Sequence, residues 1–239
     1  MNIQSAWIDL AIGDGATMRA FSAVPVGNTR SLPGLILFQE AFGVNPHIRR
    51  VAERFAAEGY VVIAPELFHR TAPAGFTCPY TDFSVVEPHL SAVSEPGLRQ
   101  DTEACWNWLQ QHPRIQRNHL ACIGYCLGGR AAFVANAHFP FRAAISYYGG
   151  RIAPELLHLT PSLHGPMLFF WAGRDKNITP DKVAAVEESL RRAKKSYINV
   201  VVSDADHGFF CEDRSVYNPQ AANEAWALTL AFLKGSVEV

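Results

Sequence analysis

The chain has little net charge and no long apolar run. Its 21 basic and 22 acidic side chains nearly cancel, leaving a formal net charge of −1 at pH 7. This balance gives no electrostatic basis for binding nucleic acid or an anionic membrane. No apolar stretch approaches the roughly 20 residues that a membrane-spanning helix needs, and the N-terminus lacks the basic and apolar segments of a secretion signal. We therefore predict a cytoplasmic protein with no nucleic-acid or membrane partner.

The sequence also lacks a disulfide or metal-binding pattern. No C-x-x-C pair occurs among its five cysteines, which are Cys78, Cys105, Cys122, Cys126 and Cys211. An odd number of cysteines without a regular framework is typical of reduced thiols in the cytoplasm. The histidines are spread over predicted turns and helix ends. We therefore predict no metal ion and no cofactor.

What the sequence does contain is an alternation of short apolar strands and helices. The predicted strands are 6–10, 18–24, 35–38, 60–64, 119–123, 143–147, 167–172 and 199–202. The predicted helices are 48–58, 98–112, 127–137, 180–193 and 221–233. This alternation indicates an α/β fold with a mostly parallel central sheet and helices on both faces.

No repeat, linker or low-complexity segment interrupts this pattern, so we predict a single α/β domain over residues 1–239. The segment 66–97 is rich in proline, threonine and aromatic residues. We predict that this loop-rich segment forms loops and a short helix over the active site, at the carboxyl edge of the sheet, where α/β proteins bind their ligands.

The most informative motif is a cysteine flanked by glycines between a predicted strand and a predicted helix. Residues 124–129 read Gly-Tyr-Cys-Leu-Gly-Gly, with Cys126 as the central residue. A strand, a sharp turn and a helix around a nucleophile form the layout of a nucleophile elbow. Small flanking residues let the strand and the helix approach each other at the strained central position. Taken alone, the motif is equally compatible with a buried cysteine in a glycine-rich turn.

Two downstream loops carry the residue types that a thiol nucleophile needs. Asp175 follows the predicted strand 167–172, and His207 follows the strand 199–202. The order nucleophile, acid, histidine is the one found in α/β-hydrolases. A thiol needs a nearby base at neutral pH, so His207 would share its proton while Asp175 fixed the imidazole orientation. The alternatives are an Asp175 that caps the next helix and a His207 that is a surface residue.

Glu40 lies at the C-terminal end of the buried strand 35–38, and we expect it to point into the same site. At this point the sequence resembles the dienelactone hydrolase family, that is, carboxymethylenebutenolidase-like proteins of the α/β-hydrolase superfamily. The resemblance covers nearly the whole chain. The matching segments are 39–45, 65–75, 124–129, 147–149, 173–175 and 207–209.

The resemblance implies a mechanism together with the residues that carry it. The implied catalytic residues are Cys126, His207, Asp175 and, as an extra acid that contacts the resting thiol, Glu40. The thiolate would attack an activated ester or lactone, and the backbone N–H groups of Leu127 and Ala41 would hold the oxyanion. Water would then hydrolyse the acyl-thioester with His207 as the general base.

The sequence departs from the family where the substrate carboxylate is bound. Family members that cleave dienelactone use two arginines, one in the mid-chain loop and one four residues after the catalytic histidine. Here the second position is Cys211, and residues 77–92 contain no arginine. Arg70, Arg99 or Arg214 could substitute, or could be surface arginines. Three other candidates for substrate contact, each of which could equally be a core or loop residue, are Phe42, His69 and Trp171.

We therefore predict a cofactor-free hydrolase that cleaves a small activated ester or lactone through Cys126. The alternatives are a thioesterase or small-ester carboxylesterase on the same triad, and a non-catalytic module that binds a small molecule. A complete acid, base and nucleophile argues against the binding module. We expect a monomer or a small homo-oligomer.

Overall fold

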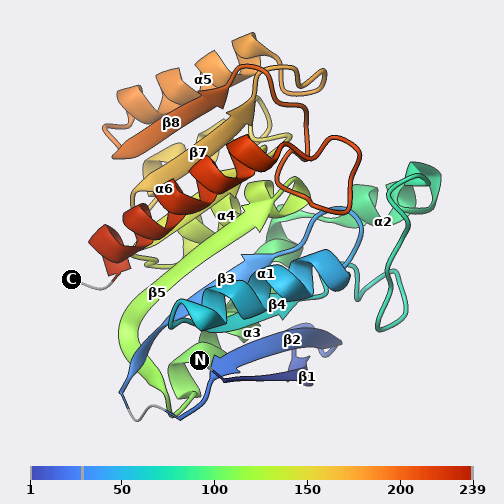
Figure 1. Ribbon diagram of the computed structural model, residues 1–239, viewed down its shortest axis with the longest axis vertical. Helices are drawn as coiled ribbons and strands as arrows, with labels where there is room; N and C mark the ends of the chain where they lie inside the picture. The colour runs from blue at the N-terminus through green and yellow to red at the C-terminus, as the bar shows by residue number, and fades with distance from the viewer. Residues whose placement is uncertain (1, 28–29, 238–239) are drawn as a thin grey trace. The chain divides into compact units, whose positions relative to one another are not determined.

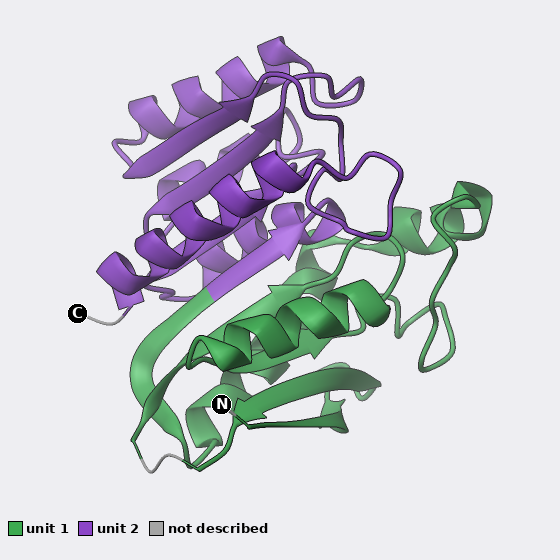
Figure 2. Ribbon diagram, in the orientation of Figure 1, with its two compact units in different colours: residues 1–121 green, residues 122–239 purple. Residues whose placement is uncertain are grey.

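The computed structural model describes residues 2–27 and 30–237. The chain divides into two compact units, unit 1 with residues 1–121 and unit 2 with residues 122–239 (Figure 2). Residues 1, 28, 29, 238 and 239 belong to the predicted 1–239 domain but lie outside the described residues.

Eight strands form one mixed, mostly parallel sheet in the order β1-β2-β4-β3-β5-β6-β7-β8 (Figure 1). The strands are β1 (Ile3–Ala11), β2 (Thr17–Pro25), β3 (Leu32–Phe38), β4 (Val61–Pro65), β5 (Ile115–Tyr125), β6 (Ala143–Tyr147), β7 (Met167–Ala172) and β8 (Tyr197–Val202). β1 pairs with β2, and β2 with β4, in antiparallel register. The pairs β3–β4, β6–β7 and β7–β8 are parallel, as the alternation of strands and helices predicts.

The helices lie where the sequence places them, with their ends moved by a few residues. The α-helices are α1 (Pro46–Ala57), α2 (Glu87–Ala92), α3 (Glu95–Gln111), α4 (Leu127–His138), α5 (Pro180–Arg192) and α6 (Pro219–Val237). Two 3₁₀ turns, η1 (Phe83–Val85) and η2 (Leu157–Ser162), were not predicted. The predicted loop-rich segment 66–97 contains η1, α2 and the first turn of α3.

In unit 1, α1 and α3 cover opposite faces of the sheet (Figure 1). Asn45 caps the N-terminus of α1, because its side-chain oxygen accepts the backbone N–H of Ile48 at 3.1 Å. Pro46 is the first helical residue, and its fixed φ suits that position. The helix buries one apolar stripe, which includes Val51 and Phe55. All five residues of β4 are buried, as in a strand covered on both faces.

In unit 2, every residue of β6 and β7 is buried, and α4 and α6 cover opposite faces of β6 (Figure 1). The hydroxyl groups of Tyr147, the last residue of β6, and Thr229 of α6 form a buried hydrogen bond of 2.7 Å. This bond satisfies both polar groups inside an apolar contact between the helix and the sheet.

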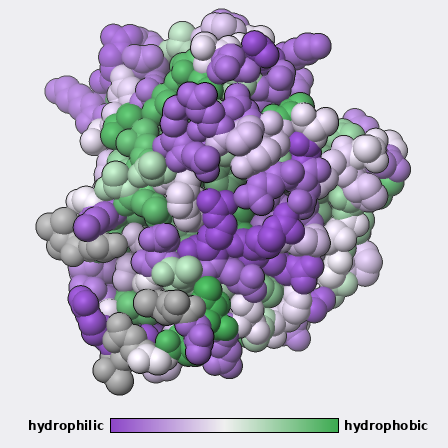
Figure 3. All heavy atoms as spheres, viewed as in Figure 1, coloured by the Kyte–Doolittle hydropathy of each residue, from purple (hydrophilic) through white to green (hydrophobic). Residues whose placement is uncertain are grey.

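Apolar side chains are mostly inside, and the face shown in Figure 3 is largely hydrophilic with scattered apolar patches. Among the residues that the structure describes, no helix has both the length and the hydropathy to cross a membrane.

Candidate active site

Cys126 occupies a strained turn between β5 and α4. Its backbone angles are φ 55° and ψ −113°, in the left-handed half of φ space that side chains rarely adopt. Its N–H donates to the carbonyl of Tyr147 at 3.0 Å, and its own carbonyl accepts the N–H of Gly129 at 3.0 Å. A methyl group on Gly124 would lie 2.0 Å from the carbonyl oxygen of Gly128. A glycine at position 124 is therefore required by the close approach of strand and helix, as the elbow motif predicts.

Solvent access distinguishes Cys126 from the other cysteines. Its side chain is partly exposed, whereas the other four cysteines are buried. Burial raises the pKa of the Cys105 and Cys122 thiols well above the ordinary value of 9.0. Burial also raises the pKa of Cys78. These three thiols are therefore poor nucleophiles at neutral pH.

Asp175 lies in the loop after β7 and is nearly buried, with 7% of its surface exposed. Its Oδ1 accepts the backbone N–H groups of Asn177 at 2.8 Å and Ile178 at 3.0 Å. Its Oδ2 lies 2.6 Å from Nδ1 of His207. Burial alone would raise the pKa of Asp175, but these hydrogen bonds and the histidine charge lower it. The residue at the N-cap of α5 is Thr179, so Asp175 braces its own loop and orients His207 instead of capping that helix.

His207 joins the acid to the thiol. It lies in the loop after β8 with 23% of its side chain exposed, and it hydrogen-bonds to both Asp175 and Cys126. Burial opposes its protonation, but a negative charge on Cys126 and the bonds to these two partners raise its pKa to about 10. The structure thus brings Cys126, His207 and Asp175 together within unit 2. In this arrangement the imidazole can accept the proton of the thiol.

The loop after β3 places three predicted residues in succession. Glu40 and Ala41 are fully buried, and Phe42 is 4% exposed. The amide of Gln39 braces this loop within unit 1, because its Nε2 donates to the Glu40 carbonyl and its Oε1 accepts the Leu67 N–H, both at 3.1 Å. Gln39 lies beside Glu40 in the motif 39–45, but no role was predicted for it.

Phe42 belongs to an aromatic cluster in unit 1. Its ring lies 4.7 Å from that of Tyr80 and 6.4 Å from that of Phe83, edge to face in both cases. The Tyr80 hydroxyl accepts the side-chain N–H of Asn45 at 2.8 Å. The segment before η1 is therefore held against the loop after β3.

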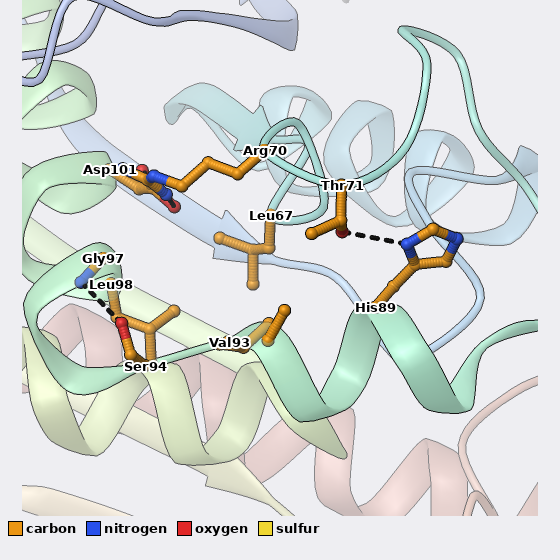
Figure 4. A pocket seen from close by; sticks show the side chains of 10 residues that line it. Leu67, Arg70, Thr71, His89, Val93, Ser94, Gly97, Leu98 and Asp101 are labelled. Atoms are coloured by element: carbon orange, nitrogen blue, oxygen red, sulfur yellow. Dashed lines mark hydrogen bonds and ion pairs between the residues drawn. The ribbon is translucent and has the colours of Figure 1, made fainter.

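His69 and Arg70 are held by hydrogen bonds to acidic and amide side chains in unit 1. His69 Nε2 lies 3.0 Å from Oδ1 of the buried Asp101. Arg70 donates to Asp101 at 3.1 Å, to Asp14 at 3.0 Å and to Gln100 at 3.2 Å. Figure 4 shows a small cavity that is lined by Arg70, Asp101, His89 and apolar residues of α2 and α3. Nδ1 of His89 is hydrogen-bonded to the hydroxyl group of Thr71. All three nitrogens of the Arg70 guanidinium thus already have protein acceptors.

Trp171 and Arg214 lie in unit 2. Trp171 is 2% exposed, stacks on Phe169 at 5.3 Å and donates its indole N–H to Asn199 at 3.1 Å. Arg214 lies close to the candidate triad, since a methyl group on Gly208 would be 1.9 Å from its Nη1. Its guanidinium therefore packs directly against the residue that follows His207. Arg99, the other arginine candidate, is an exposed residue of α3.

No group of three or more His, Cys, Asp or Glu side chains in the described part of the chain is arranged to hold a metal ion.

Comparison with known proteins identifies the family. The profile described as "Dienelactone hydrolase family" matches residues 18–237. A Synechocystis protein whose name proposes a carboxymethylenebutenolidase is 33% identical over 203 residues, covering 81% of this chain and 82% of the relative. An Escherichia coli K12 protein with the same proposed name is 30% identical, covering 92% of this chain and 83% of that protein.

Solved structures agree with this assignment. The crystal structure of a proposed dienelactone hydrolase from Klebsiella pneumoniae superposes with a TM-score of 0.89 at 29% identity, covering 98% of this chain and 99% of that chain. The fold is therefore that of an α/β-hydrolase, as predicted. The chain belongs to the dienelactone hydrolase family and is a hydrolase of that family.

Proposed function

We propose that this hydrolase cleaves an activated ester or lactone through Cys126, with His207 as the base and Asp175 as its orienting acid. The observation that carries the proposal is the hydrogen-bonded series from the partly exposed Cys126 through His207 to the buried Asp175. The strained elbow backbone adds support, because such strain persists where the surrounding structure enforces it at a functional site.

The reaction takes place in two steps. The Cys126 sulfur attacks the ester carbonyl carbon, and the resulting tetrahedral oxyanion collapses to an acyl-thioester while the imidazolium of His207 gives its proton to the leaving oxygen. His207 then removes a proton from water, the hydroxide adds to the thioester carbonyl, and the carboxylic acid leaves as the sulfur is released. Hydrolysis thus consumes one water and regenerates the enzyme.

The oxyanion is bound by backbone N–H groups. Leu127 is the first residue of α4, so its N–H has no acceptor one turn earlier in that helix and carries the positive end of the helix dipole. Ala41 supplies the second N–H, as the family resemblance implies. Each such donor is typically worth about 100- to 1,000-fold in rate.

Glu40 is the proposed extra acid. When the substrate arrives, it helps to move the thiol proton from Cys126 to His207, and this is the proton that His207 then gives to the leaving oxygen. Its complete burial and the brace from Gln39 support a fixed position for this carboxyl group.

The proposed substrate contacts are Phe42, through its ring, and Arg214, through its guanidinium beside Gly208. The hydrogen bonds of Arg70 favour an internal role instead, because all three guanidinium nitrogens donate to acceptors within unit 1. His69 and Trp171 remain predicted contacts.

The test is steady-state hydrolysis of a short aryl ester, a small lactone and a thioester by the wild type and by Cys126→Ala. We expect the variant to lose about 1,000-fold or more on the preferred substrate, and mass spectrometry of the quenched wild type to find the acyl group on Cys126. The matched control is Cys78→Ala, which removes a buried thiol in unit 1 and should retain activity. Equal rates for wild type and Cys126→Ala on all three substrates would overturn the proposal and favour a binding module.

A further inference from the structure

β8 lies at an edge of the sheet and leaves one side of its backbone open. It is the last strand in the sheet order, so within the described part of the chain it pairs with β7 alone (Figure 1). Ile198 is 43% exposed and Val201 is 58% exposed. Edge strands usually carry charged residues, prolines or bulges that prevent pairing with another chain. β8 has no charged residue and no proline among its six residues, and its register with β7 contains no bulge.

The strand at the other end of the sheet order carries more of the usual protection. The exposed positions of β1 hold Gln4, Ser5, Ala6, Asp9 and Ala11, which are polar or small. An open edge with large apolar side chains is therefore a property of β8 and not of both edge strands.

The backbone of β8 turns alternate residues toward β7 and toward the open side. The carbonyl oxygens of Ser196 and Val202 accept the N–H groups of Met167 and Gly173, so the even-numbered residues of β8 face β7. The residues whose N–H and carbonyl groups face the open side are therefore Tyr197, Asn199 and Val201. Such a row of backbone groups is a template for another strand.

This row is complementary to itself. A second copy of β8 can pair with it in antiparallel register about a two-fold axis that passes between the two Asn199 residues. Tyr197 then lies opposite Val201 of the second copy, and every open N–H and carbonyl group of the row gains a partner. On the other face of the strand, Ile198 lies opposite Val200 of the second copy, which covers exposed apolar surface.

The residues that flank β8 carry opposite charges. Lys194 is exposed before the strand, and Asp204 is exposed after it. In the register centred on Asn199, Lys194 of each copy meets Asp204 of the other, because antiparallel strands bring opposite ends together. A parallel neighbour of the same sequence would instead bring like charges together.

We propose that β8 is the interface of a homodimer in which two copies join their sheets edge to edge. The occupant is a second copy of this chain and not a strand of another protein, because the charges at the ends of β8 complement each other under a two-fold rotation. The contact is shorter than that of a standard interface, so we expect a dissociation constant of about 1–100 µM.

The test is sedimentation velocity of the full chain at about 1–300 µM, a range that spans such a dimer. We expect the wild type to pass from monomer to dimer over this range. Lys194→Glu and Asp204→Lys each place like charges at both ends of the paired strands, so each should raise the dissociation constant about 5- to 30-fold. An equimolar mixture of the two variants should return to the wild-type value, because only their heterodimer pairs opposite charges at both ends.

Two further variants sharpen the test. Val201→Lys places on the open edge a charge of the kind that protects edge strands, and it should raise the dissociation constant about tenfold or more. Lys234→Glu reverses an exposed charge of α6, outside β8 and its flanking residues, and should leave the dissociation constant unchanged.

A wild type that stays monomeric over the whole range would overturn the inference. So would a dimer that Val201→Lys and the two charge reversals leave intact, because another surface would then hold it together. Single reversals that weaken the dimer without recovery on mixing would also contradict it, since the two charges would not meet across the interface. The measurement uses no substrate, so its result does not depend on the proposed function.

Discussion

Each unit of the molecule contains a histidine bonded to a nearly buried aspartate, and the two pairs differ in their third member. In unit 1, Asp101 bonds to His69 at 3.0 Å and also to Arg70. In unit 2, Asp175 bonds to His207 at 2.6 Å, and the histidine bonds to Cys126. An arginine neutralises the first carboxylate, and its guanidinium cannot take up a proton. A thiol gives the second pair a proton to exchange, so a His–Asp pair alone does not mark an active site.

The two histidines also differ in how much of their side chains is exposed to solvent. The His69 side chain is 3% exposed, and that of His207 is 23% exposed. A buried pair fixes the position of two chain segments, whereas a partly exposed one can reach a substrate. We therefore expect substitutions in the unit 1 pair to change stability and substitutions in the unit 2 pair to change activity.

The largest expected effect is that of Asp175→Asn. The amide keeps the volume but presents a donor as well as an acceptor, so it no longer fixes the tautomer of His207. We expect kcat for the preferred ester to fall by about 1,000- to 10,000-fold, measured by steady-state kinetics. Asp101→Asn is the matched change in unit 1 and should keep activity within about twofold. Comparable losses in both variants would remove the distinction between the two pairs.

The next effect concerns the proton on His207. Because a negative charge on Cys126 contributes to its pKa of about 10, Cys126→Ser should shift the pKa down toward the ordinary 6.5. The raised folded-state value means that proton binding contributes to stability fully below pH 6.5 and that this contribution is lost as pH rises through 10. Histidine NMR titration of both proteins gives the pKa, and urea unfolding between pH 6 and 10 gives the stability.

A wild-type His207 that titrates near 6.5 would show that Cys126 is a neutral thiol in the resting enzyme. The resting proton would then reside on the sulfur until a substrate binds.

A smaller effect is expected on the stability of unit 1. Asp101→Asn removes the charge that His69 and Arg70 share, and Arg70 keeps Asp14 and Gln100 as partners. We expect the free energy of unfolding to fall by about 1–3 kcal/mol, as measured by urea denaturation at pH 7. The exposed pair Arg192–Glu188 is the control, since Arg192→Gln should cost less than about 1 kcal/mol. An equal decrease in the free energy of unfolding for the two variants would mean that the burial of Asp101 adds nothing to the stability that its interactions provide.

The smallest effect tests Arg214. If its guanidinium binds an anionic substrate group, Arg214→Gln should raise KM about tenfold for an ester with a free carboxylate and leave KM for its neutral methyl ester unchanged. Equal changes for both esters would assign Arg214 to packing against Gly208. Arg70→Gln is the comparison in unit 1, and it should alter neither KM.

The sequence predicted the fold well because its strands are short apolar runs bounded by glycine and proline. The ends of β6 and β7 are those predicted, whereas β5 extends beyond the predicted 119–123 at both ends. The turn η2 was missed, and the short helix expected within residues 66–96, which is α2, had no predicted bounds, since neither element has the repeated apolar spacing of a longer helix. Element ends moved where capping groups decide them, as Asn45 does for α1.

The order of residues along the chain was enough to predict the three candidate catalytic residues of unit 2, but not the contacts around them. Strand ends identified Cys126, Asp175 and His207, which the structure brings together. The sequence does not indicate the contact between the Tyr148 and His207 rings, although Tyr148 lies in the matching segment 147–149. The three acceptors of Arg70 come from distant parts of unit 1, and no spacing in the chain indicates them.

The burial of four cysteines and the exposure of one have a practical consequence. An excess of a mild electrophile should label a single sulfur in the folded protein and all five sulfurs in the unfolded protein. The number of labelled sulfurs per chain therefore measures the fraction of a preparation that is folded, before any substrate is known.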